Sequence, residues 1–266
     1  MLELTAIDVG QGDSLLVVFP QGSTMLIDGG GKLVYGKQSR SNLDTGEDVV
    51  APYLWRRGIR RIDILVATHA HQDHIGGLAA LLEDFRPKEL WTGANPPPAL
   101  MEQARKLGVQ VRQQRASPPF DLAGTRLQVL APTLEYVPGK EPGNNDSLAF
   151  RISYGTRSFL LTGDLEAPVE RRLLVDGAIS ATDVLKVAHH GSRTSSTRSF
   201  LDAVHPSVAL ISAGFENSFN HPHPDVVQRL QEAHTTILRT DLDGLATVRT
   251  DGTRLFFALS SWEKSP

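Results

Sequence analysis

Residues Thr68–Gly77 read THAHQDHIGG, and three histidines and an aspartate fall within the six positions from His69 to His74. The preceding segment, Ile62–Ala67, is apolar except at one position, which is typical of a strand covered on both faces. A helix is expected over Ile75–Phe85, directly after the cluster. The histidines therefore lie where a strand opens into a loop, a position at which proteins commonly display functional groups.

The side chains of this cluster are typical metal ligands. Imidazole and carboxylate groups bind zinc, manganese or iron well. Alternate residues of an extended segment point the same way, so His69 and His71 can share one metal ion. The following turn can present Asp73 and His74 to a second ion. The alternative interpretation is a polar loop whose histidines cap the helix.

The composition is that of an ordinary globular protein. Of the 266 residues, 40% are hydrophobic and 21% are charged, and the formal net charge is -3. Domains that hold nucleic acid by bulk electrostatics are usually basic, so a phosphate-bearing substrate would need metal ions or a local basic patch. The absence of cysteine excludes disulfides, thiolate zinc sites and cysteine nucleophiles. We expect a soluble chain, because no apolar run approaches the ~18 residues of a membrane span and the start lacks signal-peptide features.

Segments that fit strands alternate with segments that fit helices along the chain. This pattern predicts two mixed sheets covered by helices. No linker interrupts it, so we expect a single domain over residues 1–266. The middle, from Pro87 to Pro142, is less regular and fits a strand, a helix and a strand joined by long loops. The other helices are expected near Glu47–Arg57, Pro168–Val175, Thr197–Val204 and Pro224–Ala233.

The pattern HxHxDH after a strand resembles the metal motif of the metallo-β-lactamase superfamily. Further motifs follow the order of that superfamily: a strand that ends at Asp28, FLLTGD that ends at Asp164, and KVAHHGS with His189 and His190. The aspartate of the first of these supports the metal-ligand loop in the family. The resemblance implies an α+β protein with a four-layer αββα sandwich.

Additional motifs narrow the resemblance to the C-terminal, nuclease-like domain of ComEC-type competence proteins. These are VGQGDS at residues 9–14, NNDS at residues 144–147 and NHPHP at residues 220–224. In that family the domain belongs to a membrane protein of DNA uptake. The resemblance thus implies single- or double-stranded DNA as a partner and attachment to a membrane channel part, on the extracytoplasmic face of the inner membrane. The chain itself contains no expected membrane span.

The resemblance also implies two divalent metal ions, Mn²⁺ or Zn²⁺. Asp164 would bridge the two ions. Related phosphoesterases of the superfamily use the second histidine of a pair such as His189-His190 as a ligand, and the first then faces the substrate. The carry-over assigns His69 and His71 to the first site, and Asp73, His74 and His190 to the second.

The third motif departs from the superfamily. Many members have a histidine there that completes the first site, but this chain has none between His74 and His189. We expect Asn145, Asp146 or water to fill the place, and the amide oxygen suits manganese better than zinc. The first site should then be the weaker one. Alternatively, Asn144 and Asn145 simply form a turn before a strand.

Two loops contain further candidate substrate-binding residues. The turn at residues 10–12 lacks the third glycine of a dinucleotide-binding loop, and a strand follows it, which excludes that fold. It could bring Gln11 and Asp13 toward the metals, or serve as a structural turn only. His221, before the helix at Pro224, could receive phosphate together with free backbone N–H groups, or the segment could merely cap that helix. Phosphate could also be bound by Ser192, Arg193, Thr194 and Ser195.

We therefore predict a metal-dependent phosphodiesterase that acts on DNA during uptake. His189 or His223 could stabilise the developing charge or protonate the leaving oxygen. The alternatives are a hydrolase of small phosphoesters, such as a choline phosphoesterase, and a DNA-binding module with a degenerate metal site. Lactam hydrolysis fits less well, because HHGS and NHPHP suit phosphate. The basic run Arg56–Arg61 is better explained by a helix C-terminus than by a DNA track.

Overall fold

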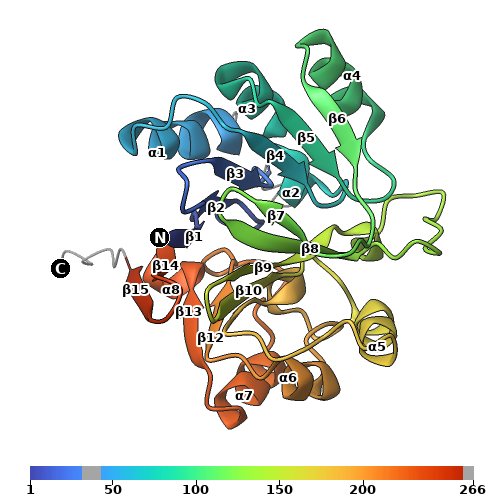
Figure 1. The fold of residues 1–266 in the computed structure, drawn as a ribbon, viewed down its shortest axis with the longest axis vertical. Helices are drawn as coiled ribbons and strands as arrows, with labels where there is room; N and C mark the ends of the chain where they lie inside the picture. Colours follow the sequence, from blue (N-terminus) through green and yellow to red (C-terminus); the bar gives the residue numbers. More distant parts are fainter. Residues whose placement is uncertain (32–42, 260–266) are drawn as a thin grey trace.

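Two β-sheets face each other in the computed structural model, which describes residues 1–31 and 43–259 (Figure 1). The first sheet has eight strands in the order β15-β14-β1-β2-β3-β4-β5-β6, and the second has seven in the order β13-β12-β11-β10-β9-β8-β7. The strands of the first sheet are β1 (Leu2–Ala6), β2 (Leu15–Val18), β3 (Thr24–Ile27), β4 (Ile64–Ala67), β5 (Glu89–Thr92), β6 (Gln110–Gln113), β14 (Ala246–Thr250) and β15 (Leu255–Leu259). Those of the second are β7 (Phe120–Leu122), β8 (Thr125–Ala131), β9 (Ala149–Tyr154), β10 (Arg157–Leu161), β11 (Val184–Lys186), β12 (Val208–Ile211) and β13 (Thr236–Arg239).

Both sheets are mixed. Strand β1 pairs antiparallel with β2 and with β14, whereas β3, β4, β5 and β6 run parallel to one another. In the second sheet, β10, β11, β12 and β13 are parallel, and β7, β8 and β9 are antiparallel. The parallel strands of each sheet end at the same edge of that sheet, so the loops that follow them lie together there.

Helices cover the outer face of each sheet and complete four layers (Figure 1). The sequence explains this arrangement in β4, where Ile64 and Val66 point into the core between the sheets while Leu65 and Ala67 point under the helices. The predicted αββα sandwich is confirmed. The first sheet is covered by α1 (Ala51–Arg56), α3 (Leu78–Phe85) and α4 (Pro98–Lys106), and the second by α5 (Ala167–Val175), α6 (Arg198–Val204) and α7 (Pro224–Glu232).

The sequence prediction differs from the structure at three places. The helix expected over Glu47–Arg57 is a short π-helix at Gly46–Val50 followed by α1. The helix expected over Ile75–Phe85 begins at Leu78 as α3, and a short helix, α2 (Gln72–Ile75), lies within the histidine cluster itself. In the middle segment, β5, α4 and β6 match the expected strand, helix and strand. The hairpin β7–β8 was missed although β8 alternates in burial, because β7 has only three residues and directly follows Pro118-Pro119.

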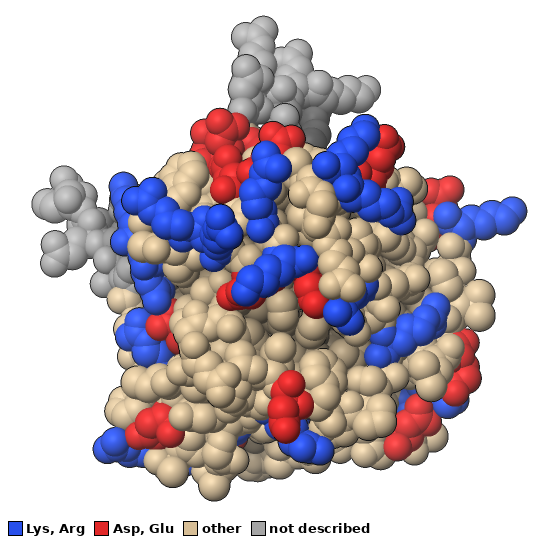
Figure 2. Space-filling view, turned by 45° about the horizontal axis from the view of Figure 1, so that its top comes forward, with Lys and Arg blue, Asp and Glu red and all other residues tan. Residues whose placement is uncertain are grey.

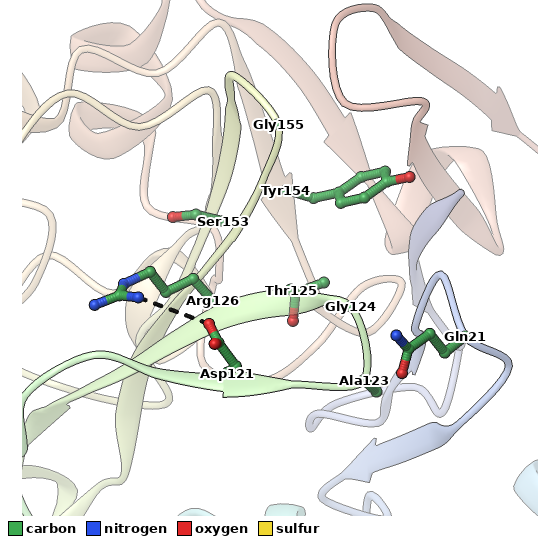
Figure 3. A pocket seen from close by; sticks show the side chains of 9 residues that line it. All are labelled: Gln21, Asp121, Ala123, Gly124, Thr125, Arg126, Ser153, Tyr154 and Gly155. Carbon is green, nitrogen blue, oxygen red and sulfur yellow. Dashed lines mark ion pairs between the residues drawn. The ribbon is translucent and has the colours of Figure 1, made fainter.

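A pocket of about 600 Å³ lies at the edge where β3 and β10 begin. Figure 3 shows that its walls come from the turns before these strands and from the β7–β8 turn, with Tyr154 and Gln21 on one side and the Asp121–Arg126 ion pair on another. It is therefore at the opposite edge from the loops that follow β3 and β10.

None of the helices in the described ranges is long and apolar enough to cross a membrane. On the face in Figure 2, Lys and Arg side chains gather in the upper half, but several of them lie beside Asp or Glu. Within the basic run, Arg57 pairs with Glu3 at 2.8 Å.

Candidate metal centre

The histidines and aspartates of the motifs meet at the edge where the parallel strands end. Asp28 follows β3, and Thr68-His69 follows β4. From the second sheet, Asp164 lies beyond β10, and His190 beyond β11. Since both groups of parallel strands end there, residues more than 100 positions apart in sequence become neighbours.

The carboxylate of Asp164 lies at the centre of this cluster. Its Oδ2 atom is 3.1 Å from Nε2 of His74, 3.6 Å from Nε2 of His190, and 3.9 Å from Nε2 of both His69 and His189. The Asp164 residue is only 1% exposed. One carboxylate oxygen thus faces four imidazoles, three of them on buried residues.

Asp28 orients the ring of His74. Oδ2 of Asp28 is 2.7 Å from Nδ1 of His74 and accepts a hydrogen bond from the hydroxyl of Thr68. Oδ1 of Asp28 accepts from the backbone N–H of Thr68. With Nδ1 donating to this carboxylate, the Nε2 lone pair of His74 is left for a metal ion. Asp28 therefore supports the metal-ligand loop, as the resemblance implied.

His190 is oriented in a similar way from behind. Its Nδ1 lies 2.9 Å from the carbonyl oxygen of Ser212 and 3.4 Å from Oδ1 of Asp13, and its Nε2 lies 3.2 Å from Oδ2 of Asp73. Both His189 and His190 have positive φ, at 51° and 52°. This conformation is uncommon for residues other than glycine and is often found at functional sites. Here it turns the two adjacent rings to different sides of the centre.

A buried ion pair lies behind His190. Lys186, at the end of β11, contacts Oδ2 of Asp13, and both side chains are almost fully enclosed. Burial by itself raises the pKa of Asp13, but Lys186 and His190 outweigh it and hold the pKa at about 2. Sequence reasoning gave Lys186 no role, although it is the first residue of the KVAHHGS motif and ends an apolar strand.

Several buried polar atoms of the cluster have no hydrogen-bond partner within the described ranges. They are Nε2 of His69, His74 and His190, and Oδ1 of Asp164. Such atoms are costly to bury without a partner. Potential ligand atoms of His69, His74 and Asp164 lie within 4.8 Å of one another, as do those of Asp73, His74 and His190. Nitrogen and carboxylate donors of this kind fit zinc, manganese or iron.

The charges of the cluster favour ionised carboxylates. Burial raises the pKa of Asp164, but the charges of His74 and His190 outweigh it and hold the pKa well below its usual range. Burial lowers the pKa of His74, but Asp164 and Asp28 raise it well above its usual value. Burial and the charge of His74 lower the pKa of His69. A divalent cation would take over the role of the protons that these carboxylates attract.

The third motif does not point its second asparagine at the cluster. Oδ1 of Asn145 accepts from the backbone N–H of Glu166 at 3.0 Å, and its Nδ2 lies 3.4 Å from Oε2 of the same residue. Asp146 accepts from the hydroxyl of Tyr136 and from the N–H of Gly143. The side chain of Asn145, which we expected as a metal ligand, therefore hydrogen-bonds to Glu166. The hydrogen bonds of Asn145 and Asp146 connect loop segments of the chain.

His71 lies at the margin of the cluster. Its Nε2 is 3.4 Å from the carbonyl oxygen of Pro142, and its ring contacts that of His69 with centroids 4.6 Å apart. The potential ligand groups in the described part of the chain include His69 but not His71. The potential ligand group that contains His69 thus takes its other members from His74 and Asp164 rather than from His71.

His189 lines the open side of the centre. Its Nδ1 is 3.3 Å from Oγ1 of Thr194 and 3.7 Å from Oε1 of Glu166, while its Nε2 faces Asp164. The ring of His221 stacks edge-on against it, with centroids 5.6 Å apart. Glu166 had no sequence signal beyond its place two residues after the fourth motif.

Of the other predicted substrate-binding groups, Asp13 belongs to the cluster, where a carboxylate oxygen lies within 4.8 Å of potential ligand atoms of Asp164 and His190. Gln11 is 2% exposed, and its Oε1 accepts from the backbone N–H of Gly214 at 3.2 Å, so it bridges two loops. Asp13 lies behind His190. Nδ1 of His223 accepts from the N–H of Asp225 and caps α7, the alternative considered for this segment. Ser192 bonds Thr194 at 3.0 Å, Ser195 is buried, and Arg193 is exposed.

The glycines that end the histidine motif allow the two metal-ligand loops to meet. A Cβ atom on Gly77 would lie 2.4 Å from the carbonyl oxygen of Gly29 and 2.4 Å from the nitrogen of Gly46. Only a residue without a side chain permits this approach. Between α2 and α3, the backbone N–H of Gly77 donates to the carbonyl oxygen of Gly30 at 3.2 Å.

Comparisons with known proteins agree with this geometry. The chain is 35% identical over 257 residues to ComE operon protein 3 of Bacillus subtilis, with 93% of this chain and 33% of the relative covered. It is 30% identical to Recombination protein 2 of Haemophilus influenzae (92% and 28% covered) and 31% identical to Competence protein ComA of Neisseria gonorrhoeae (91% and 31% covered). The chain thus spans about a third of the length of these relatives. They confirm the predicted ComEC-type resemblance.

Solved structures agree in fold alone. The diiron β-hydroxylase CmlA of Streptomyces venezuelae superposes with a TM-score of 0.59 at 17% identity, covering 94% of this chain and 54% of CmlA. The metallo-β-lactamase fold protein YhfI of Bacillus subtilis superposes with a TM-score of 0.54 at 11% identity, covering 90% and 96%. The model of the metallo-beta-lactamase superfamily matches residues 7–214, a range that contains every potential metal ligand described above. This chain belongs to the metallo-β-lactamase superfamily.

Proposed function

We propose that this chain is a DNA phosphodiesterase domain that works with two divalent metal ions, Mn²⁺ or Zn²⁺. The observation that carries the proposal is the position of Asp164, whose Oδ2 lies 3.1–3.9 Å from Nε2 of four histidines. A carboxylate between two groups of imidazoles is suited to bridge two ions. Bound divalent ions would supply Lewis acidity, lower the pKa of water and neutralise charge on the phosphoryl oxygens.

The residues of the chain have separate tasks in this proposal. Asp73, His74 and His190 would hold the second ion, and His69 would hold the first, with His71 at its margin; Asp164 would contribute to both. His189 is left facing the substrate, where its Nε2 can donate a proton to the leaving oxygen. Glu166 and Thr194 orient its ring through Nδ1. His223 is not assigned this task, because its Nδ1 caps α7.

DNA is the proposed substrate because two of the relatives are named for competence or its operon and one for recombination. The net charge of -3 means that phosphate must be held locally, by the metal ions and by groups such as Arg193 and His221. By the same similarity we propose that the domain works beside a membrane channel part, on the extracytoplasmic face of the inner membrane.

The test is cleavage of single- and double-stranded DNA by metal-loaded protein, compared with Asp164→Asn. In Mn²⁺ we expect the wild type to cleave DNA, and Asp164→Asn should lower the cleavage rate by at least about 100-fold. Asp121→Asn is the matched control, since Asp121 pairs with Arg126 at the opposite edge of the sheets. This variant should cleave DNA at the wild-type rate. Cleavage that is absent with both metals, or equal in Asp164→Asn, would exclude the proposal.

One observation favours a second candidate, a DNA-binding module without catalysis. The side chain of Asn145 is committed to Glu166, which leaves the first site without its third ligand from that motif. This candidate predicts a DNA gel shift in chelator and no cleavage in Mn²⁺. Hydrolysis of a nitrophenyl phosphodiester without cleavage of plasmid DNA would instead indicate a small phosphoester hydrolase.

A further inference from the structure

A second cavity lies beside the metal centre. It has a volume of about 280 Å³ and lies between α5 and the loop that follows β8. Pockets for drug-sized ligands begin at roughly 300 Å³, so this cavity suits one or two rings rather than a whole nucleotide. Its walls include Pro132, Tyr136, Asn145, Pro168, Val169 and Arg172.

Three side chains in contact, those of Asn145, Glu166 and His189, connect the cavity to the centre. Asn145, in its wall, contacts Glu166 through both atoms of its amide. Oε1 of Glu166 lies 3.7 Å from Nδ1 of His189, whose Nε2 faces Asp164. Helix α5 begins directly after Glu166, so the cavity wall continues the loop that carries the bridging carboxylate. The cavity and the centre thus lie on two sides of the Glu166 loop, with Asn145 and His189 on either side of its carboxylate.

The walls combine apolar surface with a few polar groups. Pro132, Pro168 and Val169 are apolar. The hydroxyl of Tyr136 bonds Oδ1 of Asp146 at 2.9 Å, which fixes the ring at the cavity. Arg172 pairs through Nε with Asp176 at 2.7 Å, and its side chain is 57% exposed, so its terminal nitrogens remain accessible. A flat ring with polar edges matches such a site better than an aliphatic or a charged group does.

We propose that this cavity binds the nucleobase adjacent to the scissile phosphate, with the base packed against the proline and valine surface. The guanidinium of Arg172 lies at the mouth and contacts the edge of the base or its sugar-phosphate. The proposal rests on the proposed phosphodiesterase function and adds a base-binding subsite to it. The larger pocket in Figure 3 cannot serve the same nucleotide, because it lies at the opposite edge of the sheets.

Binding is tested without catalysis, by amide NMR titration in chelator. Thymidine 5′-monophosphate should shift the resonances of Asn145, Val169 and Arg172, and should bind at least about fivefold more tightly than deoxyribose 5-phosphate, because only the base buries apolar surface in the cavity. Equal affinities for the two ligands, or shifts only outside the cavity, would overturn the proposal. This result does not depend on whether the protein cleaves DNA.

Catalysis is tested with a nucleoside nitrophenyl phosphodiester and with methyl nitrophenyl phosphate, which has no base. Val169→Trp fills the cavity, and Arg172→Gln removes the cation at its mouth. Both should reduce the preference in kcat/KM for the nucleoside substrate by about fivefold or more while activity on the methyl ester persists. The matched controls on the same helix, Val175→Trp and Arg171→Gln, should keep the preference.

The outcomes separate the two proposals. Binding in the cavity without hydrolysis of any phosphodiester would retain the subsite and exclude the enzymatic function. Hydrolysis with no preference for the nucleoside substrate, or a preference that Val169→Trp and Arg172→Gln leave unchanged, would retain the function and exclude the subsite.

Discussion

Nδ1 of His74 lies 2.7 Å from Oδ2 of Asp28, and the opposite ring nitrogen of the same histidine lies 3.1 Å from Oδ2 of Asp164. The ring is thus held between a supporting carboxylate and the centre of the site. Supporting hydrogen bonds of this kind set the tautomer of a metal-binding histidine and raise its basicity.

Asp28→Asn should therefore weaken metal binding by about 10- to 100-fold, because the neutral amide has one acceptor oxygen where the carboxylate has two for the donors of His74 and Thr68. The change is measured by competition with a chromogenic chelator. Asp63→Asn is the control, since Asp63 pairs with Lys88 at the other end of β4. An unchanged metal affinity in Asp28→Asn would show that His74 is not a ligand.

Replacing His189 and replacing His190 by alanine should affect different properties, the cleavage rate for His189 and metal binding for His190. His190→Ala should lose bound metal, because Nε2 of His190 is buried among Asp73 and Asp164. His189→Ala should retain metal and lose about 10²- to 10⁴-fold in cleavage, the range for a general acid. Metal content by mass spectrometry and cleavage rate are measured on the same preparations. Loss of metal in His189→Ala with retention in His190→Ala would reverse the assignment.

The buried pair of Asp13 and Lys186 should be sensitive to the loss of one partner. Asp13→Asn or Lys186→Met leaves an uncompensated buried group and should lower the free energy of unfolding by about 3–5 kcal/mol. The double variant should recover part of that loss, since neither charge is then buried alone. Urea unfolding in chelator measures all three. Additive losses in the double variant would contradict the coupling of the two charges.

The stability of the metal-free protein should depend on pH through His190. Burial lowers the pKa of His190, but Asp164 and Asp13 outweigh it and raise the pKa from 6.5 to about 9. The group therefore stabilises the fold fully below pH 6.5, and this contribution is lost as the pH rises to about 9. The difference in unfolding free energy between the wild type and His190→Gln should shrink over this window in chelator.

Metal should reverse this trend, because protons and metal compete for the same ring nitrogen. With Mn²⁺ or Zn²⁺ present, the stabilisation of the wild type by metal should grow as the pH rises. Thermal unfolding at matched pH values, with and without metal, provides the measurement. A difference between wild type and His190→Gln that is constant over pH in chelator would contradict the raised pKa.

The sequence predicted the layers and most elements because their patterns are local. The run Ile62–Ala67 is apolar at nearly every position, and the structure buries β4 on both faces. Turns and helices after such strands were recognised for the same reason. The hairpin β7–β8 was not, because β7 has only three residues and directly follows Pro118-Pro119, and its place in the second sheet depends on the pairing of β8 with β9.

The motifs by themselves determined which residue types gather at the metal centre: the histidines of Thr68–Gly77 and the aspartate of the fourth motif. Only the tertiary structure decided how these groups are held and which predicted groups are occupied elsewhere. Lys186 lies behind His190, Asn145 turns to Glu166, and His223 caps a helix. Such contacts join segments that are far apart in the chain or depend on the rotation of one side chain, and neither property leaves a periodic signal in the sequence.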